Sequence, residues 1–194
     1  MRTTCWILLT LTLGASLIPG AHPLSETEAL NAFKKNLSDP QNVLSTWNAN
    51  QANPCSWSHI VCNQDNQVTG VFLINSQLSG HLVPELGSLS ALERLILPQN
   101  DISGTIPSEL GNLKTLQTLI LSYNRLSGSI PPTLGDLQSL RTLGLDNNEL
   151  SGKIPSEIAT IKSLQIASFI DNKNLCWEFS PTPIYKGSYP LCQK

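Results

Sequence analysis

The sequence predicts a solenoid of the mixed α/β class, an elongated array of stacked coils with a parallel β-sheet along its inner face. One phrase, N-x-[LI]-S-G-x-I-P, returns at Asn100, Asn124 and Asn148, 24 residues apart. Leucines precede each phrase in a constant register, and pairs of cysteines flank the array on both sides. A fixed period of this length is the signature of repeat architectures, whose units bury their apolar faces only against neighbouring units.

Each unit reads L-x-x-L-x-L-x-x-N-x-[LI]-S-G-x-I-P, which is a leucine-rich repeat. Complete units begin at Leu92, Leu116 and Leu140, after a degenerate unit at Val68 and before a partial unit at Leu164. We expect the leucines to point inward from a short strand, and the segment after the Pro to be irregular or 3₁₀ structure. About five repeats therefore occupy residues 68–175.

The Asn of each unit is expected to close the strand. Its amide both donates and accepts hydrogen bonds, so a buried column of Asn would satisfy backbone groups of neighbouring coils. Ser76 takes this place in the opening unit. The predicted column consists of Asn100, Asn124, Asn148 and Asn172.

The residues before the repeats, 22–67, predict an N-terminal cap that begins with a helix. Ser25 and Glu28 form a capping box, and apolar residues follow at helical spacing. Asp39 and Pro40 have the residue types that begin a further helix.

Apart from Cys5 near the N-terminus, four cysteines lie outside the repeats, and they predict two disulfides. Disulfides join Cα atoms within about 7 Å, and two cysteines lie at each end of an elongated array, so the predicted pairs are Cys55–Cys62 and Cys176–Cys192. A zinc site is the alternative, but groups at opposite ends cannot share one tetrahedral ion. The first loop is expected to seal the first coil with Trp47 and Trp57. The second belongs to a C-terminal cap and tail, residues 176–194.

Residues 1–21, "MRTTCWILLTLTLGASLIPGA", are predicted to be a secretory signal peptide. The segment has an early Arg, an apolar centre and small residues at its end. Its apolar run is shorter than the roughly 20 residues of a membrane helix, which disfavours the alternative of a retained anchor. The disulfides agree with export, and we expect no membrane insertion.

The composition and motifs argue against several function classes. A net charge of −2 gives no electrostatic reason to expect a nucleic acid partner. The three histidines lie in no recognised nucleophile or metal motif. We therefore predict no enzyme activity, no metal and no cofactor.

Binding in this architecture is expected on the inner sheet, whose variable side chains project into solvent from a rigid scaffold. Several of these positions are apolar, which indicates a contact patch. The alternative is that Ile and Phe merely suit strands. The predicted protein-binding residues are Phe72, Ile74, Ile96, Gln99, Ile120, Tyr123, Asp146, Asn147 and Ile170.

The L-S-G-x-I-P segment resembles plant-type leucine-rich repeats, whose family forms a twisted right-handed superhelix with an added short second strand. "EALNAFKKNLSDPQNVLSTWN" and "NPCSWSHIVCN" resemble the N-terminal cap of plant receptor-like kinases, above all the extracellular part of the somatic embryogenesis receptor kinases. The likeness runs from about Leu24 to Cys192. With no transmembrane helix or kinase domain, the chain is also similar to small secreted leucine-rich repeat proteins of plants.

Co-receptors of that family use an aromatic residue after the cap Trp and tyrosines on the first full repeat. This sequence has Ser58, Arg94 and Pro98 there. It retains His59, so the resemblance implies His59 as a cap contact. The alternative is that His59 packs beside Trp57.

The resemblance implies a secreted plant recognition module that binds a receptor-like kinase ectodomain, or its ligand, in defence or developmental signalling. One alternative is an inhibitor of a pathogen wall-degrading enzyme, similar to polygalacturonase inhibitors; another is a structural wall component. The expected location is the apoplast or cell wall. Asn36, in Asn36-Leu37-Ser38, is a predicted N-glycosylation site.

Overall fold

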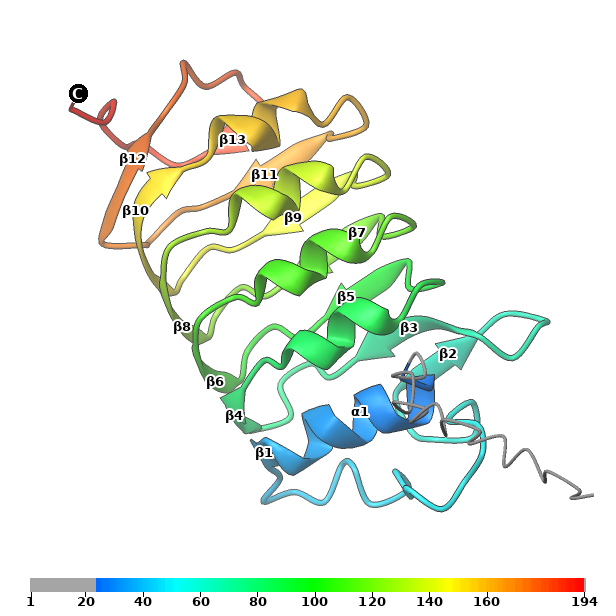
Figure 1. The fold of residues 1–194 in the computed structure, drawn as a ribbon. Coiled ribbons are helices and arrows are strands. Elements are labelled where there is room, and N and C mark those ends of the chain that lie inside the picture. The colour runs from blue at the N-terminus through cyan, green and yellow to red at the C-terminus, as the bar shows by residue number, and fades with distance from the viewer. Residues whose placement is uncertain (1–23, 194) are drawn as a thin grey trace, which may run out of the picture.

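The structure is a computed structural model that describes residues 24–193, so the expected signal peptide lies outside the described part. Coils of similar shape stack into an elongated array (Figure 1). Each complete coil adds a strand to one sheet, a second short strand to another sheet, and a 3₁₀ helix. This confirms the predicted leucine-rich repeat solenoid.

One seven-stranded sheet runs the length of the array, in the order β13-β11-β9-β7-β5-β3-β2. Its neighbours are parallel, except that β2 pairs antiparallel with β3. The last strand, β13, comes from the C-terminal tail, so this sheet continues beyond the repeats. The strands are β2 (Ile60–Cys62), β3 (Val68–Phe72), β5 (Arg94–Ile96), β7 (Thr118–Ile120), β9 (Thr142–Gly144), β11 (Ile166–Ser168) and β13 (Tyr185–Lys186).

A six-stranded sheet of short second strands lies along the side of the array, in the order β1-β4-β6-β8-β10-β12. It is parallel except for the β1–β4 pair. The plant-type second strand is therefore present. The strands are β1 (Leu37–Ser38), β4 (Ser79–His81), β6 (Asp101–Gly104), β8 (Arg125–Gly128), β10 (Glu149–Ile154) and β12 (Asn174–Trp177).

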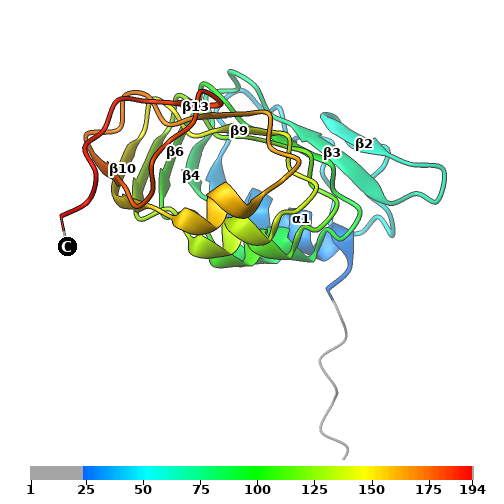
Figure 2. The ribbon, with the colours of Figure 1, turned by 90° about the horizontal axis from the view of Figure 1, so that it is seen from above.

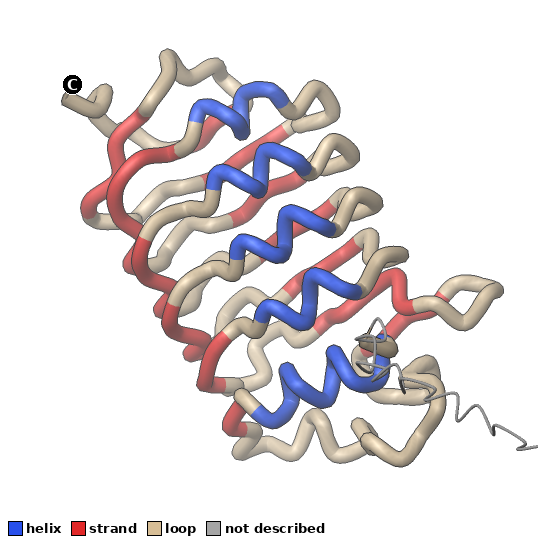
Figure 3. The backbone as a smooth tube through the Cα atoms, in the orientation of Figure 1, coloured by secondary structure: helices blue, strands red, loops and turns tan. Residues whose placement is uncertain are grey.

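The 3₁₀ helices form a row on the side of the array away from the seven-stranded sheet (Figures 2 and 3). The helices are η1 (Pro84–Ser88), η2 (Ser108–Asn112), η3 (Pro132–Asp136) and η4 (Ser156–Thr160). η2, η3 and η4 each follow the Ile-Pro step of their coil, and η1 begins at the Pro of Val83-Pro84. The repeated leucines and isoleucines fill the space between helices and sheets, so the apolar core is continuous along the array.

The predicted asparagine ladder is present. Asn148 accepts the Leu126 N–H through Oδ1 at 2.9 Å and donates from Nδ2 to the carbonyls of Leu121 and Leu145, at 3.0 and 3.1 Å. Each ladder side chain thus links its own coil to the preceding one. Asn100, Asn124 and Asn172 repeat this arrangement.

The N-terminal cap begins with helix α1 (Glu26–Lys35), and the capping box is as expected. Ser25 Oγ accepts the Glu28 N–H at 3.2 Å, and the Glu28 carboxylate accepts the Ser25 N–H at 2.8 Å. Trp47 and Trp57 are buried and stacked, with ring centroids 5.4 Å apart.

The further helix expected after Asp39 is wrong, because residues 40–47 form turns. The Asp39 carboxylate still accepts the backbone N–H groups of Val43 and Leu44, at 3.0 and 2.8 Å. The Lys34 ammonium donates to the carbonyls of Leu44 and Trp47, at 2.9 and 2.7 Å. Side chains therefore satisfy the backbone groups that a helix would have paired, and no helical ladder forms.

Both caps contain the expected disulfides, with Cα–Cα distances of 5.6 Å for Cys55–Cys62 and 5.0 Å for Cys176–Cys192. Buried Trp177 packs edge-on against Phe169, with ring centroids 5.6 Å apart, and so closes the last coil. Among residues 24–193, no helix has the length and apolar character needed to cross a bilayer.

Candidate protein-binding surface

The outward side of the seven-stranded sheet, called here the inner face, carries the predicted binding residues. In each repeat strand from β5 to β11 the central residue is buried in the core. Because side chains alternate along a strand, the residues on either side of it face outward. The sequence thus positions a row of variable side chains on a rigid frame.

Three apolar residues in adjacent strands form a ridge on the inner face. Phe72 of β3 lies in register with Ile96 of β5, which lies in register with Ile120 of β7. These side chains, called here the apolar ridge, are half-buried against one another.

The ridge ends at Gly144 of β9, the next residue in register after Ile120. A Cβ atom at Gly144 would lie 2.8 Å from Ser122 Oγ and 3.3 Å from Ile120 Cγ2. The Ser122 hydroxyl donates to the Asp146 carboxylate at 2.7 Å, and the Asn147 amide donates to its other oxygen at 3.1 Å. The apolar ridge therefore stops at Gly144, and two residues further along the chain the Asp146 carboxylate is held by two hydrogen bonds.

Arg94 is an inner-face residue that the predicted contact set missed. Its guanidinium carbon lies 5.6 Å from the centroid of the Phe72 ring, a cation–π arrangement. Arg94 belongs to an outward column at the amino ends of the strands, with Thr118, Thr142 and Ile166. Strict alternation around Leu95 would have identified this column from the sequence.

The carboxyl ends of the strands form a rim, which we define as the two residues before each ladder position. The first rim position holds Ile74 and Ile170, 52% and 44% exposed, and the second holds Tyr123, 53% exposed. The second-position residues have left-handed backbones, with φ between 48° and 58°: Asn75, Gln99, Tyr123, Asn147 and Asp171. The predicted residues thus lie in two groups, ridge and rim.

His59 lies at the N-terminal edge of the inner face. It is exposed, and its carbonyl accepts the Phe72 N–H at 3.0 Å. His59 therefore lies beside Phe72, on the N-terminal side of the apolar ridge. Ser58 is tied into the cap, because its carbonyl accepts from Trp47 Nε1 at 2.9 Å. The predicted cap contact is therefore next to the predicted inner-face contacts.

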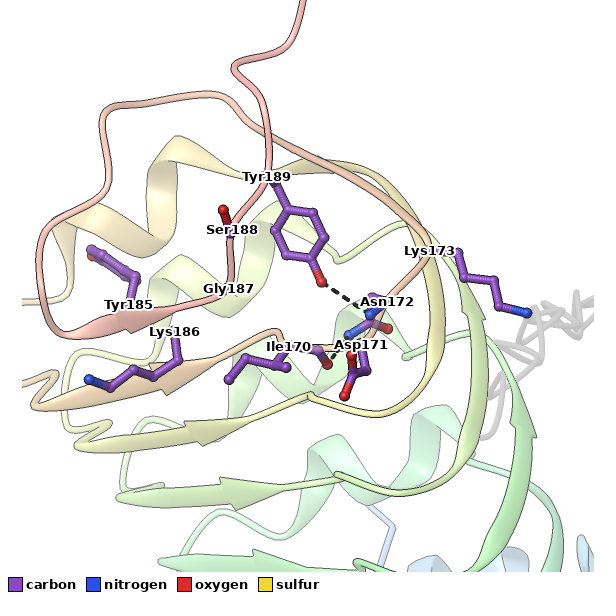
Figure 4. A pocket seen from close by; sticks show the side chains of 9 residues that line it. All are labelled: Ile170, Asp171, Asn172, Lys173, Tyr185, Lys186, Gly187, Ser188 and Tyr189. Carbon is purple, nitrogen blue, oxygen red and sulfur yellow. Dashed lines mark hydrogen bonds between the residues drawn. The ribbon is translucent and has the colours of Figure 1, made fainter.

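A pocket of about 790 Å³ lies at the C-terminal end of the inner face, and the sequence analysis did not predict it. Figure 4 shows Ile170, Lys186 and Tyr189 around it, with Tyr189 reaching toward Asn172. Burial raises the pKa of the Tyr189 hydroxyl. The pocket exists because the tail folds back over the last coil, a long-range contact that no repeat pattern encodes.

The predicted glycosylation site is far from the inner face in the fold. Asn36 is exposed at the end of α1, beside the edge strand β1 of the six-stranded sheet. Its side-chain amide donates to the Ala32 carbonyl at 2.9 Å. In the described part of the chain, no group of three or more His, Cys, Asp or Glu residues could hold a metal ion.

Comparisons with known proteins agree with this geometry. The leucine rich repeat N-terminal domain family matches residues 23–63, and the leucine rich repeat family matches residues 88–150. Leucine-rich repeat protein 1 of Arabidopsis thaliana is 52% identical over 87 residues, which are 45% of this chain and 40% of the relative. Leucine-rich repeat protein 2 of the same plant is 55% identical over 73 residues, 38% of this chain and 34% of the relative. The chain thus spans about two fifths or less of these curated relatives.

Solved structures match over much more of the chain. The BIR2 ectodomain from Arabidopsis thaliana is 31% identical, with a TM-score of 0.70, covering 78% of this chain and 94% of that one. A chain of the BIR3–SERK2 complex from Arabidopsis thaliana is 31% identical, with a TM-score of 0.72, covering 86% and 94%. PEPR1 in its structure with AtPEP1 is 38% identical, with a TM-score of 0.70, covering 78% and 21%. The repeats, both caps and these relatives together identify the chain as a member of the plant leucine-rich repeat family.

Proposed function

We propose that this chain is a secreted plant recognition module whose inner face binds the ectodomain of a receptor-like kinase, or a ligand shared with one. The observation that carries the proposal is the apolar ridge Phe72–Ile96–Ile120 on the solvent side of a rigid sheet. Contiguous apolar surface of this kind is typical of protein contact sites. Binding, not catalysis, is the role that such a surface supports.

The relatives support a protein partner. One solved neighbour is PEPR1 in its structure with AtPEP1, and another belongs to the complex of BIR3 with SERK2. The two disulfides support an extracellular location, since such bonds persist in oxidising compartments. The apoplast or cell wall, a role in defence or development, and a glycan on Asn36 belong to the same proposal.

The test is surface plasmon resonance of the purified, oxidised protein against a panel of receptor-kinase ectodomains, including BIR2, SERK2 and PEPR1, with and without their peptides. We expect saturable binding with a dissociation constant in the micromolar range or below. Ile96→Glu and Ile120→Glu should each weaken it at least tenfold, because a buried interfacial charge without a partner is costly.

Asn112→Glu is the matched control, because Asn112 is exposed on η2, on the other side of the array. It adds the same charge and should leave affinity unchanged. If Ile96→Glu and Ile120→Glu bind as tightly as Asn112→Glu, the inner-face assignment is refuted. A panel without any binding partner would refute the proposed function itself.

A further inference from the structure

The rim contains a tyrosine that the fold does not require. At the second rim position the backbone is left-handed in five successive coils. Asn75, Asn147 and Asp171 are of the residue types that adopt this region most readily. Tyr123, with φ 56°, is of a type that does so only at a cost, and so is Gln99, with φ 58°.

The Tyr123 side chain contributes little to the protein's own packing. It is exposed, and within residues 24–193 its hydroxyl makes no hydrogen bond and its ring has no aromatic neighbour. Its backbone does pair with both neighbouring coils: its N–H donates to the Asp146 carbonyl at 3.0 Å, and its carbonyl accepts the Asn100 N–H at 3.1 Å. An asparagine would make the same backbone bonds with less strain, so the packing of the described residues does not account for the tyrosine.

The other rim residues indicate the chemistry of a partner. Ile74 and Ile170 are the most exposed aliphatic residues of the rim. The ionised rim groups are the carboxylates of Asp146 and Asp171, and the oxygens of Asp146 are held by Ser122 and Asn147. The rim therefore combines a few exposed apolar side chains with polar ones, and its acidic groups lie toward its C-terminal end.

Cations lie elsewhere on this surface. Arg94 and Arg141 are at the amino ends of the strands, and Lys173 and Lys186 line the C-terminal pocket. The amino ends of the middle strands thus carry cations together with Glu93, whereas the charged groups of the rim are acidic. A complementary surface must present a cation to the carboxyl ends of the strands.

We propose that the rim, with Tyr123 at its centre, determines which partner the inner face selects. The partner is a folded protein whose surface places an apolar patch beside an arginine or lysine. The patch covers Tyr123 and Ile74, and the cation pairs with Asp146. This inference rests on the proposed function and specifies the partner of the same surface.

The test combines thermal unfolding with binding to the BIR2, SERK2 and PEPR1 ectodomains. Tyr123→Asn relieves the left-handed strain, and should raise the melting temperature by about 1–3 °C. The same variant should weaken binding at least tenfold. Tyr123→Phe keeps the ring and the strain, so its melting temperature should not change and its affinity should fall less than fivefold.

Asp146→Asn tests the cation. It keeps an oxygen for the Ser122 hydroxyl but removes the charge, so it should slow association and flatten the dependence of the association rate on salt. Asp136→Asn, at an exposed position on η3, is the matched control and should leave both unchanged. An unaltered salt dependence in Asp146→Asn would refute the cationic partner.

A rise in melting temperature together with a fall in affinity for Tyr123→Asn distinguishes a role in binding from a role in the fold. A fall in both for Tyr123→Asn would show that the fold needs the tyrosine, and would overturn the inference. A higher melting temperature with unchanged affinity would show that the rim is not part of the interface. That result would overturn the inference and leave the proposed function intact. Failure of the wild-type protein to bind any ectodomain would instead overturn the proposed function, and the inference with it.

Discussion

The hydroxyl of Tyr189 accepts the backbone N–H of Asn172 at 3.1 Å and donates to the carbonyl of Phe169 at 2.6 Å. One coil earlier, the equivalent carbonyl of Leu145 accepts the amide of Asn172 at 3.0 Å. A phenol thus takes the place of the next ladder asparagine. Tyr189 terminates the asparagine ladder at the C-terminal end of the array.

Tyr189→Phe should therefore destabilise the protein by about 1–3 kcal/mol, because it leaves the Asn172 N–H without its partner. The measurement is the free energy of unfolding in urea. Tyr123→Phe removes a hydroxyl that makes no hydrogen bond in the described residues, and should change stability by less than about 0.5 kcal/mol. Equal stability of the two variants would contradict the role of Tyr189 as terminator.

Within the ladder, Asn148→Ala should cost at least about 1–3 kcal/mol, because the buried Leu126 N–H loses its acceptor. The carbonyl of Leu121 loses a donor at the same time. Asn112→Ala, on the exposed surface of η2, provides the comparison and should be nearly neutral. Hydrogen exchange should locate the loss of protection in the coils on either side of Asn148; uniform protection would count against a local ladder.

Two glutamates should give opposite pH dependences. Burial raises the pKa of Glu26, although its carboxylate accepts the Val68 N–H. A raised folded-state pKa contributes stability that is complete below the unfolded value and is lost as pH rises through the folded value. The hydrogen bond from Lys153 lowers the pKa of Glu178, which contributes stability above the unfolded value that is lost as pH falls.

Melting temperatures of wild type, Glu26→Gln and Glu178→Gln between pH 4 and 7 check this. Relative to Glu26→Gln, the wild type should lose stability as pH rises. Relative to Glu178→Gln, it should gain stability over the same range. Parallel curves for all three proteins would refute both assignments.

Gly144 and Gly152 should tolerate substitution differently. A Cβ at Gly152 would meet nothing within 4 Å, but φ is 83°, so Gly152→Ala should cost about 1 kcal/mol and Gly152→Asn less. Gly144→Ala should cost about 1–3 kcal/mol, because its Cβ would meet the Ser122 hydroxyl. Gly144→Asn should be at least as costly. Denaturant unfolding of the four variants tests the contrast, which would fail if Asn were the better substitute at both sites.

Periodic and local patterns were sufficient for most of the fold. The inward leucines, the ladder asparagines and the 3₁₀ segments were predictable because the same interactions between adjacent coils recur along the array. The capping box of Ser25 and Glu28 and the Cys55–Cys62 loop involve residues close in sequence. The turn after Asp39 was mispredicted because the Asp39 carboxylate accepts the Val43 and Leu44 N–H groups, which a helix would have paired with its own backbone carbonyls.

By itself, the sequence determined the coil, the number of coils and the two disulfides, because each depends on a pattern repeated every 24 residues or on residues close together in the chain. The tertiary structure decided what happens where the repetition stops. Tyr189 and strand β13 reach the last coil from the tail, and the strain at Tyr123 depends on a backbone angle that residue type does not reveal. The tail contacts arise once per molecule, and the left-handed angle recurs at a position whose residue type varies from coil to coil, so no pattern in the chain predicts them.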